Sequence, residues 1–177
     1  MQQAESMTFR CKSCGAMHDI GDISFGAGAP AVWDLLSDEE KRNSELGGEQ
    51  CVINDRDGNT SFFVRACLLI PIQGEEPKNF DWGVWASLSE KSFLEMSEHW
   101  EDPERVRLGP YFGWLHTPIP CYPDTMYLKT MVHHRAVGKR PVVVLEPTDH
   151  LLALHQRQGI PPADLKRIIE KVLHDSS

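Results

Sequence analysis

The sequence lacks any apolar run that approaches the roughly 18 residues needed to cross a bilayer. Its first seven residues contain no basic side chain and no hydrophobic stretch, which is not the pattern of a secretory signal peptide. Five cysteines, an odd number, fit a reducing compartment better than a disulfide framework. We therefore expect a cytoplasmic protein with no membrane association.

Recognisable catalytic signatures are also missing. No segment matches a nucleotide-binding loop, and neither a His-Glu-x-x-His motif nor a comparable carboxylate cluster is present. No internal repeat or low-complexity tract is visible. The sequence thus gives no positive indication of an enzyme.

Charge is spread unevenly over the 177 residues. Residues 1–125 carry 10 basic and 21 acidic side chains, whereas residues 126–177 carry 8 basic and 5 acidic ones. An acidic body argues against general nucleic-acid binding, because most of that affinity comes from neutralising phosphates. The basic residues Lys129, Arg135, Lys139 and Arg140 are the one candidate anion patch, and we interpret them as charges guarding a solvated strand edge.

Hydrophobic periodicity predicts the order of the secondary structure. A helical stretch over 31–46, with a possible break at Ser37, comes first and ends at Gly47. A second helix is expected from Ser87 or Ser89 to about Trp100. Strands are expected at residues 51–54, 61–72, 80–88, 108–116, 126–135 and 140–146.

Two helices are expected to end the chain. Thr148 is a candidate cap for a short helix that Gly159 stops, and Pro161 and Pro162 open a longer one. Apolar residues recur along that last helix at the spacing of an amphipathic helix packed on a core. These are Leu165, Ile168, Ile169, Val172 and Leu173.

This pattern predicts an α+β fold. We expect a mainly antiparallel sheet of about five to six strands, with helices at both ends and a Cys/His metal-binding loop near the N-terminus. Residues 1–6 are expected to be disordered and 7–175 to form a single domain. Within it we expect a zinc-knuckle-like loop over 7–20, the sheet core over 51–146 and the C-terminal helices over 148–174.

Cys11-Lys-Ser-Cys14-Gly-Ala-Met-His18 is the one stretch with the chemistry of a site. Two thiols three positions apart and a nearby imidazole are ligands that zinc prefers, and the glycine permits a tight turn. A structural zinc needs four protein ligands. We therefore predict Cys11, Cys14, His18 and Cys51 as the metal ligands, with zinc as the metal.

Two other interpretations of this stretch remain open. The cysteines could be a reduced, metal-free pair at a surface turn. They could instead form a redox pair, although thioredoxin-like pairs occur in a βαβ setting that this sequence does not predict.

Other candidate residues favour structural roles. Asp149 and His150 fit a capped helix start better than a catalytic pair, because adjacent helical residues diverge by about 100°. Cys121 is placed like an exposed nucleophile but would need a base such as His116 or His150 nearby. Cys67 falls in an apolar strand and is expected in the core.

The aromatic and histidine residues of the strands add two expectations. Trp85 and Trp114 could line a groove for a ligand or partner. His133 and His134 should point to opposite faces of their strand, so the two cannot share a metal.

Several segments together carry a family resemblance. These are Asp81-Trp-Gly-Val-Trp85, Tyr111-Phe-Gly-Trp-Leu115, Tyr122-Pro-Asp-Thr125 and Glu146-Pro-Thr-Asp-His150. With them the chain resembles an uncharacterised bacterial family, domain of unknown function 2199, from the Cys11 motif to Ile160. The resemblance implies a stand-alone bacterial cytoplasmic domain with similarity at the Cys-x-x-Cys-Gly-x-x-His start and near Cys51. Leu151 departs from the proline expected after Asp-His, and no activity comes with the resemblance.

The function expected from these observations is a non-enzymatic binding module with one structural zinc. Its partner is expected to be another protein, and an acidic exterior suits a basic one. The alternatives are a metal-dependent hydrolase that uses the Cys/His site, or a thiol redox or metal sensor.

Overall fold

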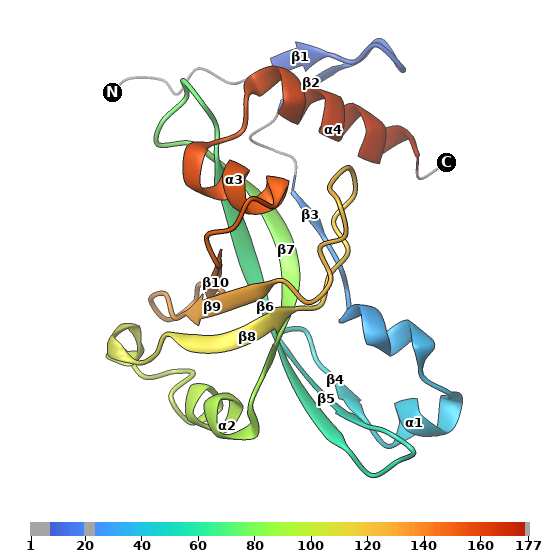
Figure 1. Ribbon diagram of the computed structural model, residues 1–177, viewed down its shortest axis with the longest axis vertical. Helices are drawn as coiled ribbons and strands as arrows, with labels where there is room; N and C mark the ends of the chain where they lie inside the picture. The colour runs from blue at the N-terminus through green and yellow to red at the C-terminus, as the bar shows by residue number, and fades with distance from the viewer. Residues whose placement is uncertain (1–7, 20–23, 176–177) are drawn as a thin grey trace.

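The computed structural model describes residues 8–19 and 24–175, which form an α+β fold with two separate sheets (Figure 1). The expectation of a disordered start at residues 1–6 lies outside the described residues. The smaller sheet is an antiparallel hairpin of β1 (Thr8–Arg10) and β2 (Met17–Asp19). No helix among the described residues is both long and apolar enough to span a membrane.

The larger sheet contains eight strands. They are β3 (Phe25–Gly26), β4 (Glu45–Leu46), β5 (Gln50–Asn54), β6 (Thr60–Pro71), β7 (Asn79–Leu88), β8 (Tyr111–Leu115), β9 (Lys129–His133) and β10 (Val142–Leu145). The helices are η2 (Ala31–Leu35), α1 (Asp38–Arg42), α2 (Glu90–Glu98), η3 (Arg105–Arg107), α3 (Leu151–Gln158) and α4 (Pro162–His174).

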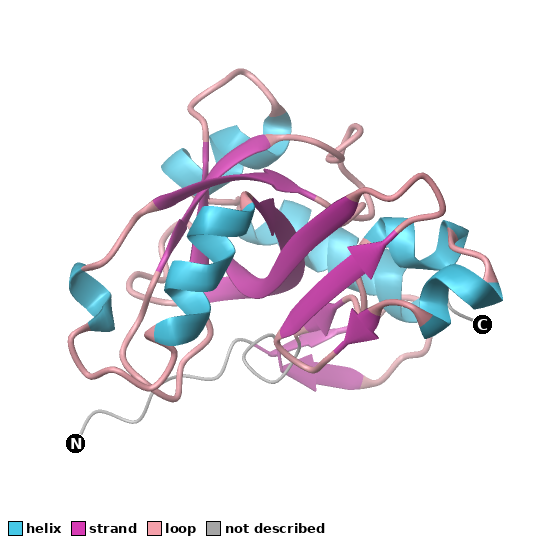
Figure 2. Cartoon of the chain, turned by 90° about the horizontal axis from the view of Figure 1, so that it is seen from below, coloured by secondary structure: helices cyan, strands magenta, loops and turns pink. Residues whose placement is uncertain are grey.

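Five of these strands close into a barrel (Figure 2). The strand order is β6-β7-β8-β9-β10, and β10 then pairs with β6 to complete the ring. The prediction of a mainly antiparallel sheet of five to six strands is therefore right only in part. Most neighbours are antiparallel, but β10–β6 and β3–β7 are parallel, and the sheet closes on itself. Closure pairs strand edges that an open sheet would leave exposed.

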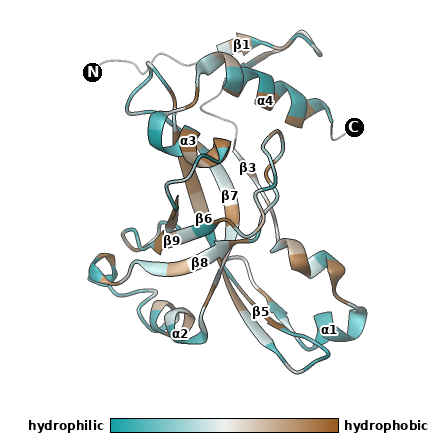
Figure 3. Ribbon diagram, viewed as in Figure 1, coloured by the Kyte–Doolittle hydropathy of each residue, from teal (hydrophilic) through white to brown (hydrophobic). Residues whose placement is uncertain are grey.

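The main core depends on the alternation of side chains along β6 and β7. These strands pair through ten residue pairs, from Phe62–Leu88 to Pro71–Asn79. Successive side chains of a strand point to opposite faces, so every second residue enters the barrel. The inward set is Val64, Ala66, Leu68 and Ile70 on β6 with Trp82, Val84, Ala86 and Leu88 on β7. Figure 3 shows brown, hydrophobic stretches on both strands, separated by paler and teal residues.

A second, smaller core lies on the other face of the same strands. It contains Cys51, Ile53, Phe63 and Trp85, and η2 packs against it through Val32 and Trp33. Trp85 therefore faces away from Trp82, which belongs to the main core, as strand alternation requires. Its indole Nε1 donates a hydrogen bond of 2.9 Å to the carbonyl of Ala27.

The three longer helices complete the main core. α4 contributes Leu165, Ile168 and Ile169, which belong to the apolar stripe expected from the sequence. α2 and α3 add Phe93, Met96, Leu152 and Ala153. Phe9 and Cys11, from the first residues described, join the same cluster, which brings the start of the chain against its last helix.

The helix prediction over 31–46 is corrected. Ser37 caps α1 through a complete capping box with Glu40, and this breaks the stretch into η2 and α1. Leu46 belongs to β4, whose pairing with β5 outweighs the local helical pattern. Likewise the cap of α3 is His150 rather than Thr148.

Gly113 offers a test of the barrel packing. A Cβ at this position would lie 2.2 Å from the carbonyl oxygen of Ser87 on the neighbouring strand, so β7 and β8 would have to separate. We expect Gly113→Ala to lower the free energy of unfolding by about 1–3 kcal/mol, the usual range for overpacking. Gly48→Ala is the control, since a Cβ there meets nothing within 4 Å, and it should change stability by less than about 0.5 kcal/mol. Urea unfolding monitored by tryptophan fluorescence measures both, and equal stability of the two variants would contradict the packing described.

Candidate metal centre

The hairpin of β1 and β2 is built around a tight turn. Gly15 donates its N–H to the carbonyl of Cys11 at 2.9 Å, and Cys11 donates to the carbonyl of Ala16 at 2.9 Å. Gly15 has a φ of 70°, a left-handed conformation that glycine adopts without a steric penalty. The turn therefore has the geometry expected from the Cys-x-x-Cys-Gly sequence.

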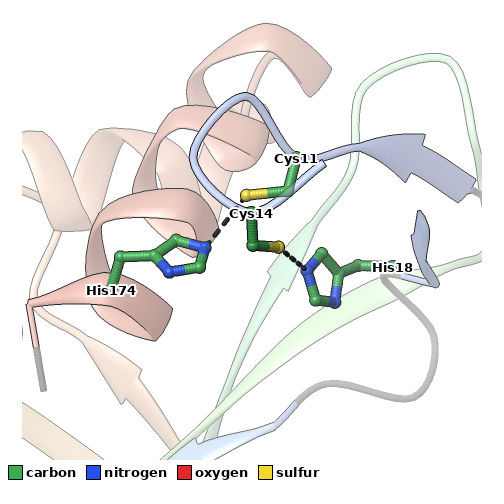
Figure 4. Close-up of side chains that lie close together, drawn as sticks. All are labelled: Cys11, Cys14, His18 and His174. Atoms are coloured by element: carbon green, nitrogen blue, oxygen red, sulfur yellow. Dashed lines mark hydrogen bonds between the residues drawn. The ribbon is translucent and has the colours of Figure 1, made fainter. Parts of the chain in front are cut away.

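Four side chains gather beside this turn (Figure 4). They are Cys11, Cys14, His18 and His174, and their ligand atoms all lie within 4.8 Å of one another. Cys11 Sγ is 2.9 Å from His174 Nε2, and Cys14 Sγ is 3.4 Å from His18 Nε2. The three ligands predicted from the N-terminal motif are thus brought together.

His174 comes from the last turn of α4, 163 residues after Cys11. Two further contacts hold the hairpin against this helix. The backbone N–H of Lys12 donates to the Glu170 carboxylate at 3.0 Å, and the Lys166 ammonium lies 5.3 Å from the centre of the Phe9 ring. Glu170 and His174 are one helical turn apart, so both reach the same hairpin.

Cys51, the fourth ligand predicted from the sequence, is not part of this group. It lies on β5 in the second core, with Ile53, Phe63 and Trp85 as neighbours. Its side chain therefore faces the second core, on the outer face of β6 and β7. The β1–β2 hairpin packs on the main core instead. Burial raises the pKa of the Cys51 thiol to about 11, so this cysteine stays protonated at neutral pH.

Cys11 has the opposite electrostatic environment. Burial raises the pKa of its thiol, but hydrogen bonds from the backbone of Cys14 and Ser13 and from the His174 and Cys14 side chains outweigh it. The net effect lowers the pKa of Cys11 to about 6. The thiolate, which is the metal-binding form of cysteine, is therefore favoured at neutral pH.

The donor set fits a soft divalent metal ion. Two thiolates and two imidazoles are a common ligand set of structural zinc, which binds four protein ligands in a tetrahedron. The four residues come from the turn, from β2 and from α4. A metal bound here would join the two ends of the described chain.

The remaining candidates have structural contacts. His150 caps α3, since its Nδ1 accepts a hydrogen bond of 3.1 Å from the N–H of Leu152. Its Nε2 lies 3.0 Å from the Asp124 carbonyl oxygen, so the second ring nitrogen is engaged as well.

Cys121 is exposed, and within the described residues its thiol forms a hydrogen bond with neither His116 nor His150. Cys67 is buried, as expected.

The two tryptophans considered for a groove differ. Trp85 is fully buried and lines no groove. Trp114 on β8 is 39% exposed and forms the wall of a shallow hollow of about 190 Å³ with Tyr127 and Lys129. His133 ends β9 and is half-buried, whereas His134 follows the strand and is buried against the Tyr111 ring.

His174 is the member of this group that sequence reasoning missed. The local motif supplies three donors, but the fourth comes from a distant helix and carries no spacing signal. The one indirect signal is the amphipathic pattern of α4, which predicts that the helix packs on the core. Eight histidines occur in the chain, and that pattern does not single out one of them.

Comparison with known families gives one match. Residues 10–160 match the family described as an uncharacterized protein conserved in bacteria, DUF2199. This covers most of the chain, which therefore belongs to that family. The matched segment includes Cys11, Cys14 and His18, whereas His174 follows it. Comparisons with curated proteins and with solved structures returned no match.

The contrast between the buried and exposed thiols can be measured. We expect iodoacetamide at pH 8 to alkylate Cys121 at least about tenfold faster than Cys51, because Cys51 is buried and its pKa is raised to about 11. Peptide mass spectrometry after brief labelling of the folded protein measures both rates. In guanidinium chloride the two rates should become similar. Rapid labelling of Cys51 in the folded protein would contradict its placement in the second core.

Proposed function

We propose that this member of the DUF2199 family is a non-enzymatic protein-binding module stabilised by one structural zinc ion. The zinc ligands are Cys11, Cys14, His18 and His174. The observation that carries the proposal is the convergence of these four donors, from both ends of the described chain, to within 4.8 Å of one another.

The number of donors supports a structural rather than a catalytic metal. A catalytic zinc keeps one position open for water, usually with three protein ligands, whereas four protein ligands close the coordination sphere. Bound here, zinc would hold the β1–β2 hairpin against α4. Because this hairpin pairs with no strand of the barrel, the metal would replace contacts that a larger sheet would provide.

The protein-binding surface is proposed on the outer face of β8, β9 and β10. Phe112 and Trp114 on β8 are exposed there with an edge-to-face contact at 5.3 Å, and Val144 on β10 is exposed as well. Exposed aromatic residues of this kind are enriched at protein interfaces. The net charge of −8 favours a basic protein as the partner. We place this interaction in the cytoplasm, where the five free cysteines would stay reduced.

The zinc proposal is tested by metal analysis of untagged protein purified without chelator. We expect about one zinc per chain in the wild type and a loss of at least about tenfold in zinc affinity for Cys14→Ser and for His174→Ala. Both variants should also melt at a lower temperature, because binding energy in a structural site contributes to folding.

Cys51→Ser is the matched control for the thiol substitution. It removes a cysteine outside the group, so zinc content should remain at one per chain. Metal-free wild-type protein would contradict the proposal, and so would loss of zinc from Cys51→Ser with retention in His174→Ala.

Two further experiments on this protein distinguish a structural zinc site from the alternatives, a hydrolytic metal centre and a thiol redox pair. In a hydrolytic centre, small anions would bind the metal and shift the spectrum of a cobalt-substituted sample. In a redox pair, Cys11 and Cys14 would form a disulfide reversibly without metal. A closed structural site shows neither behaviour, and its thiols react with alkylating reagents only after the metal has been removed.

The binding surface is tested by a photo-crosslinking amino acid at position 114 in cells. We expect a discrete adduct with a basic protein, identified by mass spectrometry. Leu35, which is 84% exposed on η2, provides the control position and should give no such adduct. The same adducts at positions 114 and 35, or no adduct at 114, would contradict the proposed surface.

A further inference from the structure

A basic hollow lies on the barrel where one edge of β6 is shared by two strands. β5 pairs with β6 up to the pair Gln50–Val64, and β10 pairs with the same edge at Val142–Cys67. The two strands diverge between these points. The hollow that opens there has a volume of about 510 Å³.

A buried arginine shapes the wall of this hollow. The Arg105 side chain is 1% exposed and donates hydrogen bonds to the carbonyl oxygens of Arg135 at 2.7 Å, Ala136 at 2.9 Å and Lys139 at 2.8 Å. A further donation goes to the carbonyl of Trp100, whose ring lies 5.2 Å from the guanidinium. These bonds fix the β9–β10 turn in one conformation.

The partners of Arg105 leave its charge without a counterion. All of its hydrogen bonds go to neutral carbonyl groups, and it forms no ion pair with another described residue. Carbonyl dipoles stabilise a buried cation but do not cancel its net charge. The hollow therefore keeps a positive potential from this residue.

Two more cationic side chains, Lys139 and Arg135, face the hollow with N–H donors that could bind a ligand. Lys139 is exposed, and its ammonium forms no ion pair among residues 8–19 and 24–175. Arg135 uses its Nε to bond the Arg140 carbonyl at 2.6 Å, and its terminal nitrogens form no hydrogen bond within the part of the chain that the structure describes. Arg140 is already neutralised by Glu49, with contacts of 2.8 Å to both carboxylate oxygens.

The charge balance of the hollow differs from that of the whole protein. Four cationic residues line it against the two carboxylates of Glu49 and Glu101, whereas the chain as a whole carries −8. The sequence-based interpretation of Arg135, Lys139 and Arg140 as guards of a strand edge is thus incomplete. Lys129 of the same basic cluster lies elsewhere, against Trp114.

We propose that this hollow binds a small phosphorylated molecule, with Lys139 and Arg135 contacting the phosphoryl oxygens. A guanidinium supplies paired N–H donors that match phosphate oxygens, and an ammonium adds a point charge. The volume exceeds what a single phosphate fills, and the Trp100 ring offers an apolar wall for the rest of the ligand. No residue of the hollow belongs to the Cys/His group, so this site is independent of the zinc proposal.

The test uses inorganic pyrophosphate as the probe, in isothermal titration calorimetry at low ionic strength. We expect saturable binding at one site per chain, weakened at least about tenfold by Lys139→Gln and restored by Lys139→Arg. The backbone carbonyl of Lys139, rather than its side chain, bonds Arg105, so these variants should keep the fold. Lys129→Gln changes the net charge equally on another surface and should leave the affinity unchanged.

Three outcomes would overturn the proposal. One is the absence of saturable heat in the wild type, and another is equal weakening by Lys129→Gln and Lys139→Gln, which would indicate a general charge effect. The third is binding of a single-stranded oligonucleotide without binding of pyrophosphate, which would assign the cations to a nucleic-acid surface.

Discussion

The long pairing of β6 with β7 is the constraint on which the rest of the structure depends. On each of these strands, the edge that faces away from the β6–β7 pairing is paired with two different strands along its length. β6 pairs with β5 and β10, and β7 pairs with β3 and β8. β8 and β10 close the barrel, whereas β5 contributes Cys51 and Ile53 to the second core. Both the basic hollow and the burial of Cys51 follow from the pairing of β5 and β10 with one edge of β6.

Two parts of the molecule lie outside the regular sheet and are held by side chains instead. The β1–β2 hairpin rests on α4 through Phe9, Lys12 and the Cys/His group. The β9–β10 turn rests on the buried guanidinium of Arg105. In both places a few polar contacts hold the segment in position, as backbone pairing between strands does in the sheet. These contacts also bring reactive or charged groups close together.

The sequence predicts those features that depend on neighbours along the chain. The Ser37 capping box, the opposite faces of Trp82 and Trp85, and the turn at Gly15 all follow from local spacing, and the structure contains each of them. The α+β class follows from the same kind of evidence.

The features that sequence reasoning missed depend on contacts between distant residues. Barrel closure rests on β10 meeting β6, a parallel contact between residues 142 and 67 that no local pattern encodes. His174 joins Cys11 for the same reason, since the docking of α4 on the core decides which histidine arrives. The ligand prediction for Cys51 rests on its residue type and its place at the start of a predicted strand, whereas its position on β5 places its side chain in the second core. Arg105 gave no signal, because a single arginine between two predicted elements resembles any surface residue.

The distance along the chain between Cys11 and His174 has a consequence for protein synthesis. A ribosome makes Cys11 163 residues before it makes His174. The four donors therefore meet only after the barrel strands and the final helix have been released and packed. Until then the thiols of Cys11 and Cys14 have no His174 beside them, so the completed group forms only in a chain in which α4 has docked on the core.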